Sequence, residues 1–252
     1  MTTMKKITHC RGLAWSAVPV VCVMTLYTPP VNALAIDNMV LISGQNPTGD
    51  QFTLTGNDNS AVFVRTQVTR LHVKENQVTE EPFLRENLMK WTITVNPALF
   101  ILDPGESRQV SLSPITTPAS READEVYAVS FIPQAAKKTE KGNLMDMQIG
   151  FQTYYIVPAT TAKMDYTLRY QPTTGKLTLV NKGNTVMLAE LDRCKPGEKI
   201  DPKQSCTTTF MAIAGRTKEY EVPQWLRGAD MTVEVLNHDK SYRQKTRPEI
   251  VR

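Results

Sequence analysis

Residues that commonly build catalytic and metal sites are scarce in this sequence. The 252 residues include three histidines and four cysteines, and no G-x-S-x-G, H-E-x-x-H or phosphate-cradling glycine motif is present. His72 ends an alternating run and His238 precedes a polar tail, a setting typical of exposed histidines rather than of a general base. Asp124 and Glu125 are adjacent acids, but neighbours on a strand point to opposite faces, so solvated surface charge is the better interpretation of the pair. The sequence therefore predicts no enzyme, no cofactor and no metal site.

Long hydrophobic runs are also missing, apart from one short stretch near the N-terminus. Residues 12–26 are largely apolar, three basic residues precede them, and Pro29 and Pro30 follow. The small residues Ala33 and Ala35 occupy the two positions that a signal peptidase reads. We therefore expect residues 1–35 to be a secretory signal peptide cleaved near Ala35. The alternative is a membrane anchor, but an anchor needs about 18 or more apolar residues, so stable membrane insertion is not expected.

Excess positive charge is confined to that segment. The whole chain carries 29 lysines and arginines against 25 acidic residues, a formal net charge of +4. Lys5, Lys6 and Arg11 lie within residues 1–35, which contain no acid, so the mature chain keeps 26 basic residues and a net charge of +1. A nearly neutral protein lacks the electrostatic footprint expected for a nucleic-acid partner.

Two cysteines, Cys194 and Cys206, remain after Cys10 and Cys22 leave with the signal. In an oxidising compartment such a pair most simply forms a disulfide. Closing a loop of about a dozen residues would contribute on the order of 3 kcal/mol of stability. The alternative of two zinc ligands lacks partners, because neither mature histidine lies at a ligand-like spacing.

Short alternating runs separated by turn residues dominate the mature chain, and helical periodicity is almost absent. Eight runs are expected to be strands before a polar, threonine-rich stretch near residues 158–163: 38–43, 51–56, 61–73, 90–95, 100–102, 107–112, 125–133 and 145–157. Six more follow: 166–170, 176–180, 185–191, 207–214, 218–222 and 231–236. The pattern predicts an all-β protein of two immunoglobulin-like β-sandwich domains, residues 36–158 and 159–252. The polar tail after His238 is expected to be only loosely attached.

The last expected strand of the first domain carries an unusual row of apolar side chains. Met145, Met147, Ile149 and Phe151 fall on one face, while polar residues and Gly150 fall on the other. This row either packs into its own sandwich core, as half-buried strands usually do, or belongs to an edge strand that offers its side chains and backbone to another chain.

Four segments together resemble the periplasmic chaperones of the chaperone–usher pathway. In order they are N-S-A-V-F-V at 59–64, V-N-P-A-L-F-I-L-D-P-G-E-S at 95–107, Y-A-V-S-F-I-P at 127–133 and V-N-K-G-N-T at 180–185. They lie behind an export signal and across two β domains. The late cysteine pair and the spacing are more similar to the alternate-type chaperones of common-pilus and colonisation-factor systems.

The resemblance implies a fold of two immunoglobulin-like domains in a boomerang arrangement. It also implies that the protein is a periplasmic chaperone, which binds pilin subunits by lending them the last strand of its first domain. Its partners would be pilin subunits and an outer-membrane usher, and it would be a monomer when bound to a subunit. Met145, Met147, Ile149 and Phe151 match the donor strand of that family. Methionine suits a strand that must fit several subunits.

The sequence departs from this family at its basic residues. Many members anchor the pilin's terminal carboxylate with an arginine in the first strand and a lysine in the last, but the matching positions here are near Val40 and near Thr153 or Tyr154. The candidate anchors are instead Thr153, Arg65 and Lys163. The arginine that precedes the domain-ending proline in many members is Val157 here, so the family's interdomain charge network is either absent or rebuilt.

Two other functions fit the sequence less well. A pilus structural subunit or adhesin of the same pathway would carry an alternating N-terminal extension, which residues 36–50 do not show. A secreted hydrolase on a β-sandwich would need the catalytic motifs that are missing.

Overall fold

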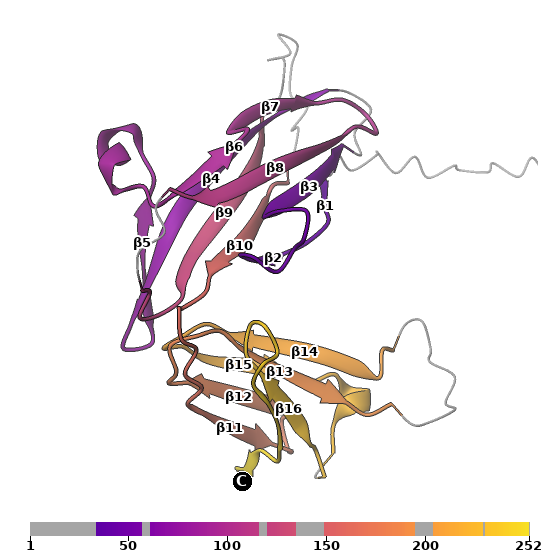
Figure 1. Ribbon diagram of the computed structural model, residues 1–252. Helices are drawn as coiled ribbons and strands as arrows, with labels where there is room; N and C mark the ends of the chain where they lie inside the picture. The colour runs from indigo at the N-terminus through magenta and orange to yellow at the C-terminus, as the bar shows by residue number, and fades with distance from the viewer. Residues whose placement is uncertain are drawn as a thin grey trace, which may run out of the picture. The chain divides into compact units, whose positions relative to one another are not determined.

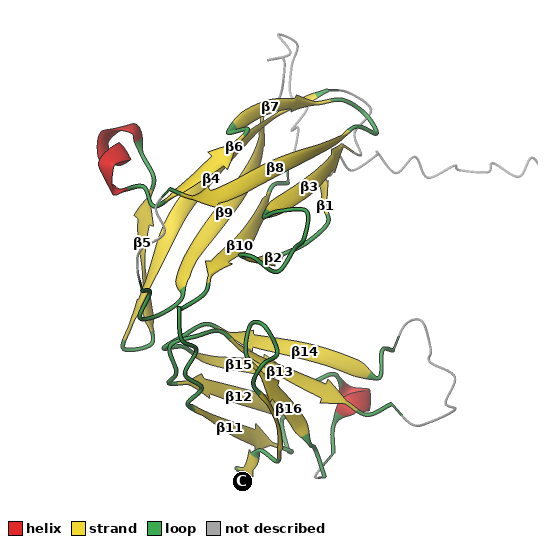
Figure 2. Cartoon of the chain, viewed as in Figure 1, coloured by secondary structure: helices red, strands yellow, loops and turns green. Residues whose placement is uncertain are grey.

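A computed structural model of the chain describes residues 34–56, 61–115, 120–134, 149–194, 204–228 and 230–251. These residues belong to one compact unit built almost entirely of β-strands, with two short 3-10 helices, η1 (Arg85–Lys90) and η2 (Gln224–Leu226). Figures 1 and 2 show the strands gathered into two groups along the chain. The expected all-β fold of two β-sandwich domains is therefore confirmed. Within the described ranges, no helix has the length and apolar character needed to cross a bilayer.

The first domain contains a four-stranded and a six-stranded sheet. The four-stranded sheet has the order β1 (Leu34–Ile36), β3 (Gln51–Gly56), β8 (Ser107–Pro114) and β6 (Ile93–Asn96). The six-stranded sheet has the order β2 (Val40–Ile42), β10 (Phe151–Val157), β9 (Glu125–Gln134), β4 (Val62–Lys74) and β5 (Gln77–Pro82), with β7 (Leu99–Leu102) also paired to β4. The short β2 pairs with β10 in parallel.

The core of the first domain forms because alternate residues of both sheets point inward. In β3, Phe52 and Leu54 are fully buried while their neighbours are partly exposed. Phe52 meets Phe131 of the six-stranded sheet edge to face, with ring centroids 5.7 Å apart. Such aromatic pairs stabilise beyond the area they bury, so this contact joins the two sheets into a sandwich.

The second domain is a smaller sandwich of two four-stranded sheets. One has the order β15 (Thr217–Glu221), β12 (Lys176–Asn181), β11 (Tyr166–Gln171) and β18 (Glu249–Ile250). The other has the order β14 (Thr207–Ala212), β13 (Met187–Asp192), β16 (Val233–Leu236) and β17 (Arg243–Thr246). Its core includes Leu177, Leu179, Ala189, Val233 and Val235, all fully buried.

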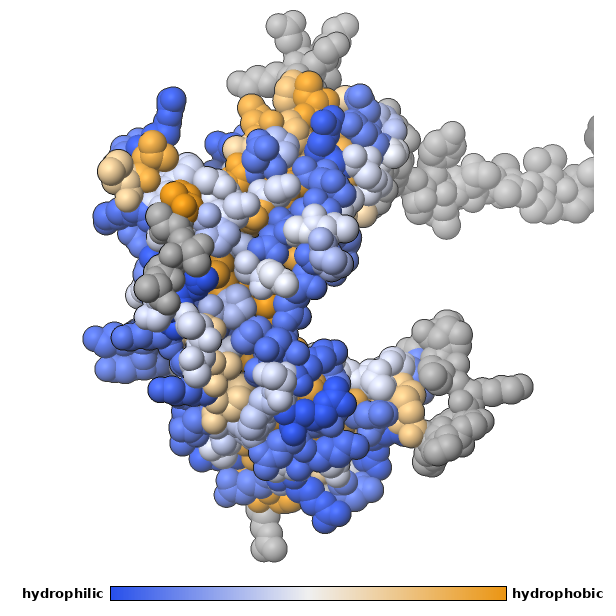
Figure 3. All heavy atoms as spheres, in the orientation of Figure 1, coloured by the Kyte–Doolittle hydropathy of each residue, from blue (hydrophilic) through white to orange (hydrophobic). Residues whose placement is uncertain are grey.

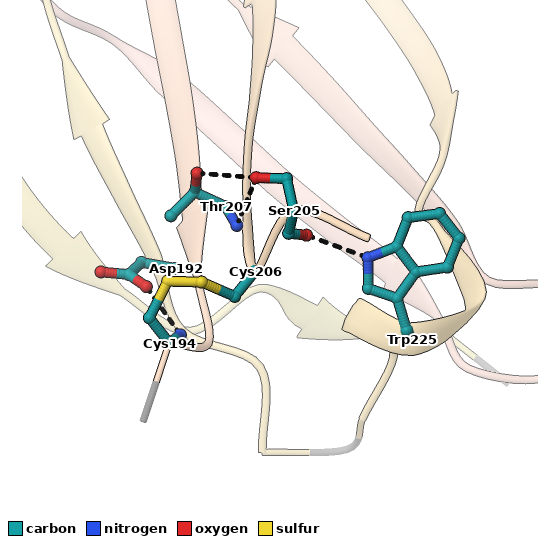
Figure 4. Close-up of a disulfide and its surroundings, with 6 residues drawn as sticks. All are labelled: Asp192, Cys194, Ser205, Cys206, Thr207 and Trp225. Carbon is teal, nitrogen blue, oxygen red and sulfur yellow. Dashed lines mark hydrogen bonds between the residues drawn. A yellow bond between two sulfur atoms is a disulfide. The ribbon is translucent and has the colours of Figure 1, made fainter. Parts of the chain in front are cut away.

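A disulfide between Cys194 and Cys206 connects the ends of β13 and β14, as expected from the sequence. The backbone N–H of Arg193 also donates to the Cys206 carbonyl at 3.0 Å, so the hairpin ladder continues up to the bridge. Figure 4 shows the bridge with Ser205 and Trp225 beside it. On the other side, the Trp225 indole N–H donates to the Ser205 carbonyl at 2.9 Å. The bridge therefore joins two chain segments, and the hydrogen bond from Trp225 holds the indole beside them.

The polar tail after His238 is not loosely attached, so that expectation is wrong. Tyr242 packs against the core of the second domain, β17 pairs with β16, and β18 pairs with β11. Backbone pairing to two edge strands holds a segment that has little apolar material of its own. The strand pattern also missed β1, β5 and η1, and the run expected at 90–95 begins inside η1.

The structure bears on where a signal peptide would be cleaved. Leu34 is 4% exposed within the core of the first domain, and β1 pairs residues 34–36 with β3. Cleavage after Ala35 would remove this buried leucine, a loss of about 2–5 kcal/mol by analogy with leucine truncations. Cleavage after Ala33 keeps it and still presents a small residue, Ala33, directly before the cut, with Val31 two positions earlier.

We therefore expect the mature chain to begin at Leu34 rather than Ile36. Intact-mass measurement and N-terminal sequencing of the exported protein distinguish the two. An Ala33→Leu substitution should block processing, whereas Ala35→Leu should not. An N-terminus at Ile36 would show that the cell discards β1 despite its buried side chain.

Candidate functional site

The last strand of the first domain, β10, is only half covered by neighbouring strands. On one side β9 pairs with all of Phe151–Val157. On the other side β2 pairs only with Tyr154–Ile156. Within the described ranges, no strand pairs with Phe151–Thr153 on that second side. The first half of β10 is therefore an open sheet edge, the kind of edge that accepts a strand from another chain.

The directions of the N–H and carbonyl groups at this open edge follow from the hydrogen bonds of the covered half of β10. Tyr154 N–H donates to the Met39 carbonyl at 2.9 Å, and the Ile156 carbonyl accepts from Ser43 N–H at 2.8 Å. Because hydrogen-bonding directions alternate along a strand, the N–H and carbonyl of Gln152 point to the same side. There they meet no described strand, and a partner strand could pair with them.

Side chains on the inward face become more exposed toward the start of β10. Tyr155 and Thr153 are fully buried, and Phe151 is partly buried against the core of the first domain. Ile149, two residues earlier, is 45% exposed. Two members of the predicted row, Met145 and Met147, lie outside the described residues. The described part of the row thus runs from the domain's own core at Phe151 to an exposed apolar side chain at Ile149.

Gly150 is required between these two residues because β9 approaches it closely. A Cβ added at Gly150 would lie 2.5 Å from the Phe131 carbonyl oxygen and 3.1 Å from Pro133 Cδ. Contacts under 3.0 Å to backbone force the chain to move. Glycine therefore lets the start of β10 lie directly against β9.

Thr153 cannot serve as the carboxylate anchor that the sequence suggested. Its side chain is fully buried, and its hydroxyl donates to the Val129 carbonyl at 3.1 Å. A hydroxyl on the core side of the sheet, already hydrogen-bonded within its own domain, does not reach a partner. The expectation for Thr153 is wrong, because alternation places the odd-numbered residues of β10 inward.

The other two candidate anchors are exposed but lie apart from Thr153. Arg65 is on the outward face of β4, opposite Ile132 of β9. Lys163 lies between the domains, where its backbone exchanges hydrogen bonds with Asn184. The structure therefore does not bring the three predicted anchors together.

An outward apolar patch beside Arg65 was not predicted. Cross-strand pairing places Phe63 opposite Ile101 and Arg65 opposite Leu99, and the next strand adds Ile132. Leu99 is 60% exposed, Ile101 46% and Phe63 36%. Apolar surface is visible at the end of the first domain where β7 lies (Figure 3). The sequence signal was ambiguous, because the run L-F-I-L at 99–102 shows no polar alternation that would mark an exposed face.

A polar network fastens the covered half of β10 to the loop after β2. The Tyr155 hydroxyl donates to Asp50 at 2.7 Å and lies 3.1 Å from the Ser43 hydroxyl. The same carboxylate accepts from the Ser43 hydroxyl and from Gly44 N–H. Burial raises the pKa of Tyr155 above its ordinary value, so the phenol stays protonated and continues to donate. This network fixes the position at which the open edge ends.

The remaining titratable groups do not form a reactive site in the part of the chain that the structure describes. His72 makes an exposed contact with Glu81 at 3.1 Å, and this hydrogen bond lowers the pKa of the Glu81 carboxyl. His238 Nδ1 lies 3.2 Å from the Thr185 hydroxyl. No three histidine, cysteine or acidic side chains within those ranges gather as metal ligands.

Comparison with known proteins points to fimbriae. Residues 36–158 match the family model described as the CS5 fimbrial protein N-terminal domain. This match confirms the resemblance to proteins of fimbrial biogenesis that the sequence motifs suggested. An Escherichia coli protein described as "Uncharacterized 25.9 kDa protein in CS5 3'region" is 25% identical over 132 residues, which are 52% of this chain. The match spans 56% of the length of that relative.

Solved structures of pilus chaperones are also similar to this chain. The Escherichia coli chaperone DraB covers 86% of this chain and 97% of its own, with 14% identity and a TM-score of 0.47. The Salmonella enterica SafB chaperone, solved with the SafA pilin, covers 88% and 97%, with 14% identity and a TM-score of 0.48. The CsuC–CsuE chaperone–tip subunit complex of Acinetobacter baumannii covers 87% and 100%, with 10% identity and a TM-score of 0.48.

Proposed function

We propose that this chain is a non-enzymatic periplasmic chaperone that binds pilin subunits by donor-strand complementation and delivers them to an outer-membrane usher. The observation that carries the proposal is the half-open edge of β10. There the backbone of Gln152 points away from β9, and Ile149 is exposed next to it.

The physical argument is that an incomplete subunit exposes an apolar groove and an unpaired sheet edge. A donated strand supplies both missing parts at once. Its N–H and carbonyl groups pair with the subunit's edge, and each apolar side chain moved from water into the groove contributes about 1.5–3 kcal/mol. Ile149 and the predicted neighbours Met145 and Met147 would fill the groove. Phe151, which already packs on its own domain, would close the near end.

Delivery to an usher needs a second surface that stays free while a subunit occupies β10. The outward apolar patch of Phe63, Leu99, Ile101 and Ile132 suits this task, because three of these residues lie on β4 and β7, away from the open edge. Arg65 lies within this patch and would face the usher, whereas Lys163, outside the patch, would meet a subunit's terminal carboxylate through charge-assisted hydrogen bonds.

The proposal is tested by co-expressing the chain with a pilin encoded beside its gene and purifying the periplasmic complex. A stable one-to-one complex is expected. Ile149→Asp should reduce its recovery by about tenfold or more, since a carboxylate would enter an apolar groove.

Ile250→Asp is the matched control, because Ile250 has nearly the same exposure, 47%, on β18 of the second domain. It should leave recovery unchanged. Equal recovery from both variants would remove β10 from the binding site. Absence of any complex with the unaltered chain would contradict the chaperone function itself.

A further inference from the structure

Asp124, which the proposed binding edge does not use, lies where the two β domains meet. It precedes β9, and its carboxylate accepts three hydrogen bonds. Oδ1 accepts from Ala159 N–H at 2.8 Å, and Oδ2 accepts from Val186 N–H at 2.7 Å and from the Thr185 hydroxyl at 3.1 Å. Ala159 comes two residues after the end of β10, and Val186 immediately precedes β13 of the second domain. One side chain therefore ties together the first domain, the connecting segment and the second domain.

The Asp124 side chain is partly buried, and the three residues that donate to it are almost closed to water. Thr185 and Val186 are fully buried, and Ala159 is 6% exposed. Burial raises the pKa of the Asp124 carboxyl, and the hydrogen bonds from Ala159, Val186 and Thr185 act against that rise. A partly buried carboxylate loses some of its water contacts, and hydrogen-bond donors must replace them. Here two of the three donors are backbone groups, whose places are set by the course of the chain.

Main-chain contacts around Asp124 repeat the same connection. Asp124 N–H donates to the Asn184 carbonyl at 2.9 Å. The Asn184 side-chain amide donates to the Glu122 carbonyl at 2.6 Å and to the Thr161 carbonyl at 3.0 Å. Asn184 thus lies between the segment before β9 and the connecting segment, and it hydrogen-bonds to both.

A second contact between the domains comes from the turn between β4 and β5. Thr217 N–H donates to Asn76 Oδ1 at 2.8 Å, and the Arg216 guanidinium donates to the Asn76 carbonyl. Asn76 has a φ of +64°, a conformation that asparagine adopts more readily than most residues. Val126 and Ile156 of the first domain also form a small buried apolar cluster with Val186 of the second.

We propose that Asp124 is a positioning residue that locks the second domain to the end of β10 through backbone N–H groups. It takes the place of the interdomain charge network that the valine at 157 ruled out in its usual form. The lock holds β10 against the second domain, so a subunit bound at the open edge meets both domains in one fixed arrangement. This last step rests on the proposed chaperone function, whereas the lock itself does not.

Tryptic cleavage after Lys163 reports directly on the lock. Lys163 is exposed, but its backbone is held by Asn184, so cleavage requires local opening. Asp124→Ala should accelerate cleavage after Lys163 by about tenfold or more, because protease attack follows the population of the open form. Thr185→Val, which removes one donor only, should give a smaller increase. Unchanged cleavage in both variants would overturn the proposal.

The matched control is Asp50→Asn. Asp50 also accepts three hydrogen bonds, but all its donors belong to the first domain, so cleavage after Lys163 should stay at the wild-type rate. Urea unfolding followed at Trp91 and at Trp225 separates a lost lock from a damaged domain. In Asp124→Ala, the urea unfolding transitions of both domains should still be observed. If either transition disappeared, the faster cleavage would come from an unfolded domain, and the positioning role would be rejected.

A second arm measures recovery of the pilin complex with Asp124→Ala. Recovery should fall together with faster cleavage. Faster cleavage with undiminished recovery would reject the link between the lock and subunit binding. If the unaltered chain captures no pilin, the chaperone proposal fails, and the cleavage rates still decide whether Asp124 locks the domains.

Discussion

Replacing Gly150 with alanine is expected to reduce recovery of a pilin complex by about tenfold or more. The added methyl group would lie 2.5 Å from the Phe131 carbonyl oxygen, which belongs to the rigid centre of the six-stranded sheet. The start of β10 must therefore move away from β9, and Ile149 moves with it. Overpacking of this kind costs about 1–3 kcal/mol. Complex recovery and the free energy of unfolding should both be measured.

Gly105→Ala provides a control of similar stability cost. Gly105 has a φ of +74° and no atom within 4 Å of an added Cβ. Alanine there would cost about 1–2 kcal/mol through backbone strain, at a turn between β7 and β8 and away from β10. Complex recovery should survive this change. If both variants lose the complex equally, binding follows overall stability and not the geometry of β10.

Alternation along single strands was sufficient to predict much of this fold. The runs expected at 61–73 and 125–133 correspond closely to β4 and β9. The first half of β4 alternates between buried and exposed residues, whereas β9 contains a continuous buried apolar run. The pattern failed where a segment is held by pairing rather than by apolar side chains. β5 and β17 have almost no buried residues, and their hydrogen bonds to β4 and β16 leave no trace in local composition.

The candidate site was also predicted only in part from the sequence. The apolar row that includes Ile149 and Phe151 was visible in the sequence, and so was the choice between core and edge. The open edge itself could not be predicted, since it depends on where the short β2 stops pairing with β10. That end point is set by Asp50 and Tyr155, which are 105 residues apart in the chain. The inward direction of Thr153 could have been predicted, because Thr153 follows Phe151 by two residues and therefore lies on the same face of the strand.

The environment of the Asp124 side chain was predicted wrongly from the sequence, and the physical reason is clear. Beside Glu125 it was interpreted as solvated surface charge, because adjacent residues on a strand face opposite ways. The neighbours do diverge: Glu125 pairs with Arg70 at 2.8 Å, and Asp124 turns to Ala159 and Val186. Two of its three donors are backbone N–H groups, which every sequence contains, so residue types could not reveal them.

Reducing the Cys194–Cys206 disulfide is expected to lower the free energy of unfolding of the second domain by about 3 kcal/mol. The bridged residues are 12 apart in sequence, and most of the loss would come from the freedom regained by this loop in the unfolded chain. The double substitution Cys194→Ser with Cys206→Ser should match the effect of reduction. The first domain contains neither cysteine and should keep its stability.

Two tryptophans allow the domains to be followed separately in this experiment. Trp91 stacks on Phe83 in the first domain, with ring centroids 5.3 Å apart, and Trp225 lies beside the bridge in the second. With Trp91→Phe as background, the Trp225 fluorescence transition should move to lower urea on reduction. With Trp225→Phe as background, the Trp91 transition should not move. A shift of the unfolding transition to lower urea in both backgrounds would mean that the two domains unfold as one unit. The change in stability would then include the contacts around Asp124 and Asn76 as well as the bridge.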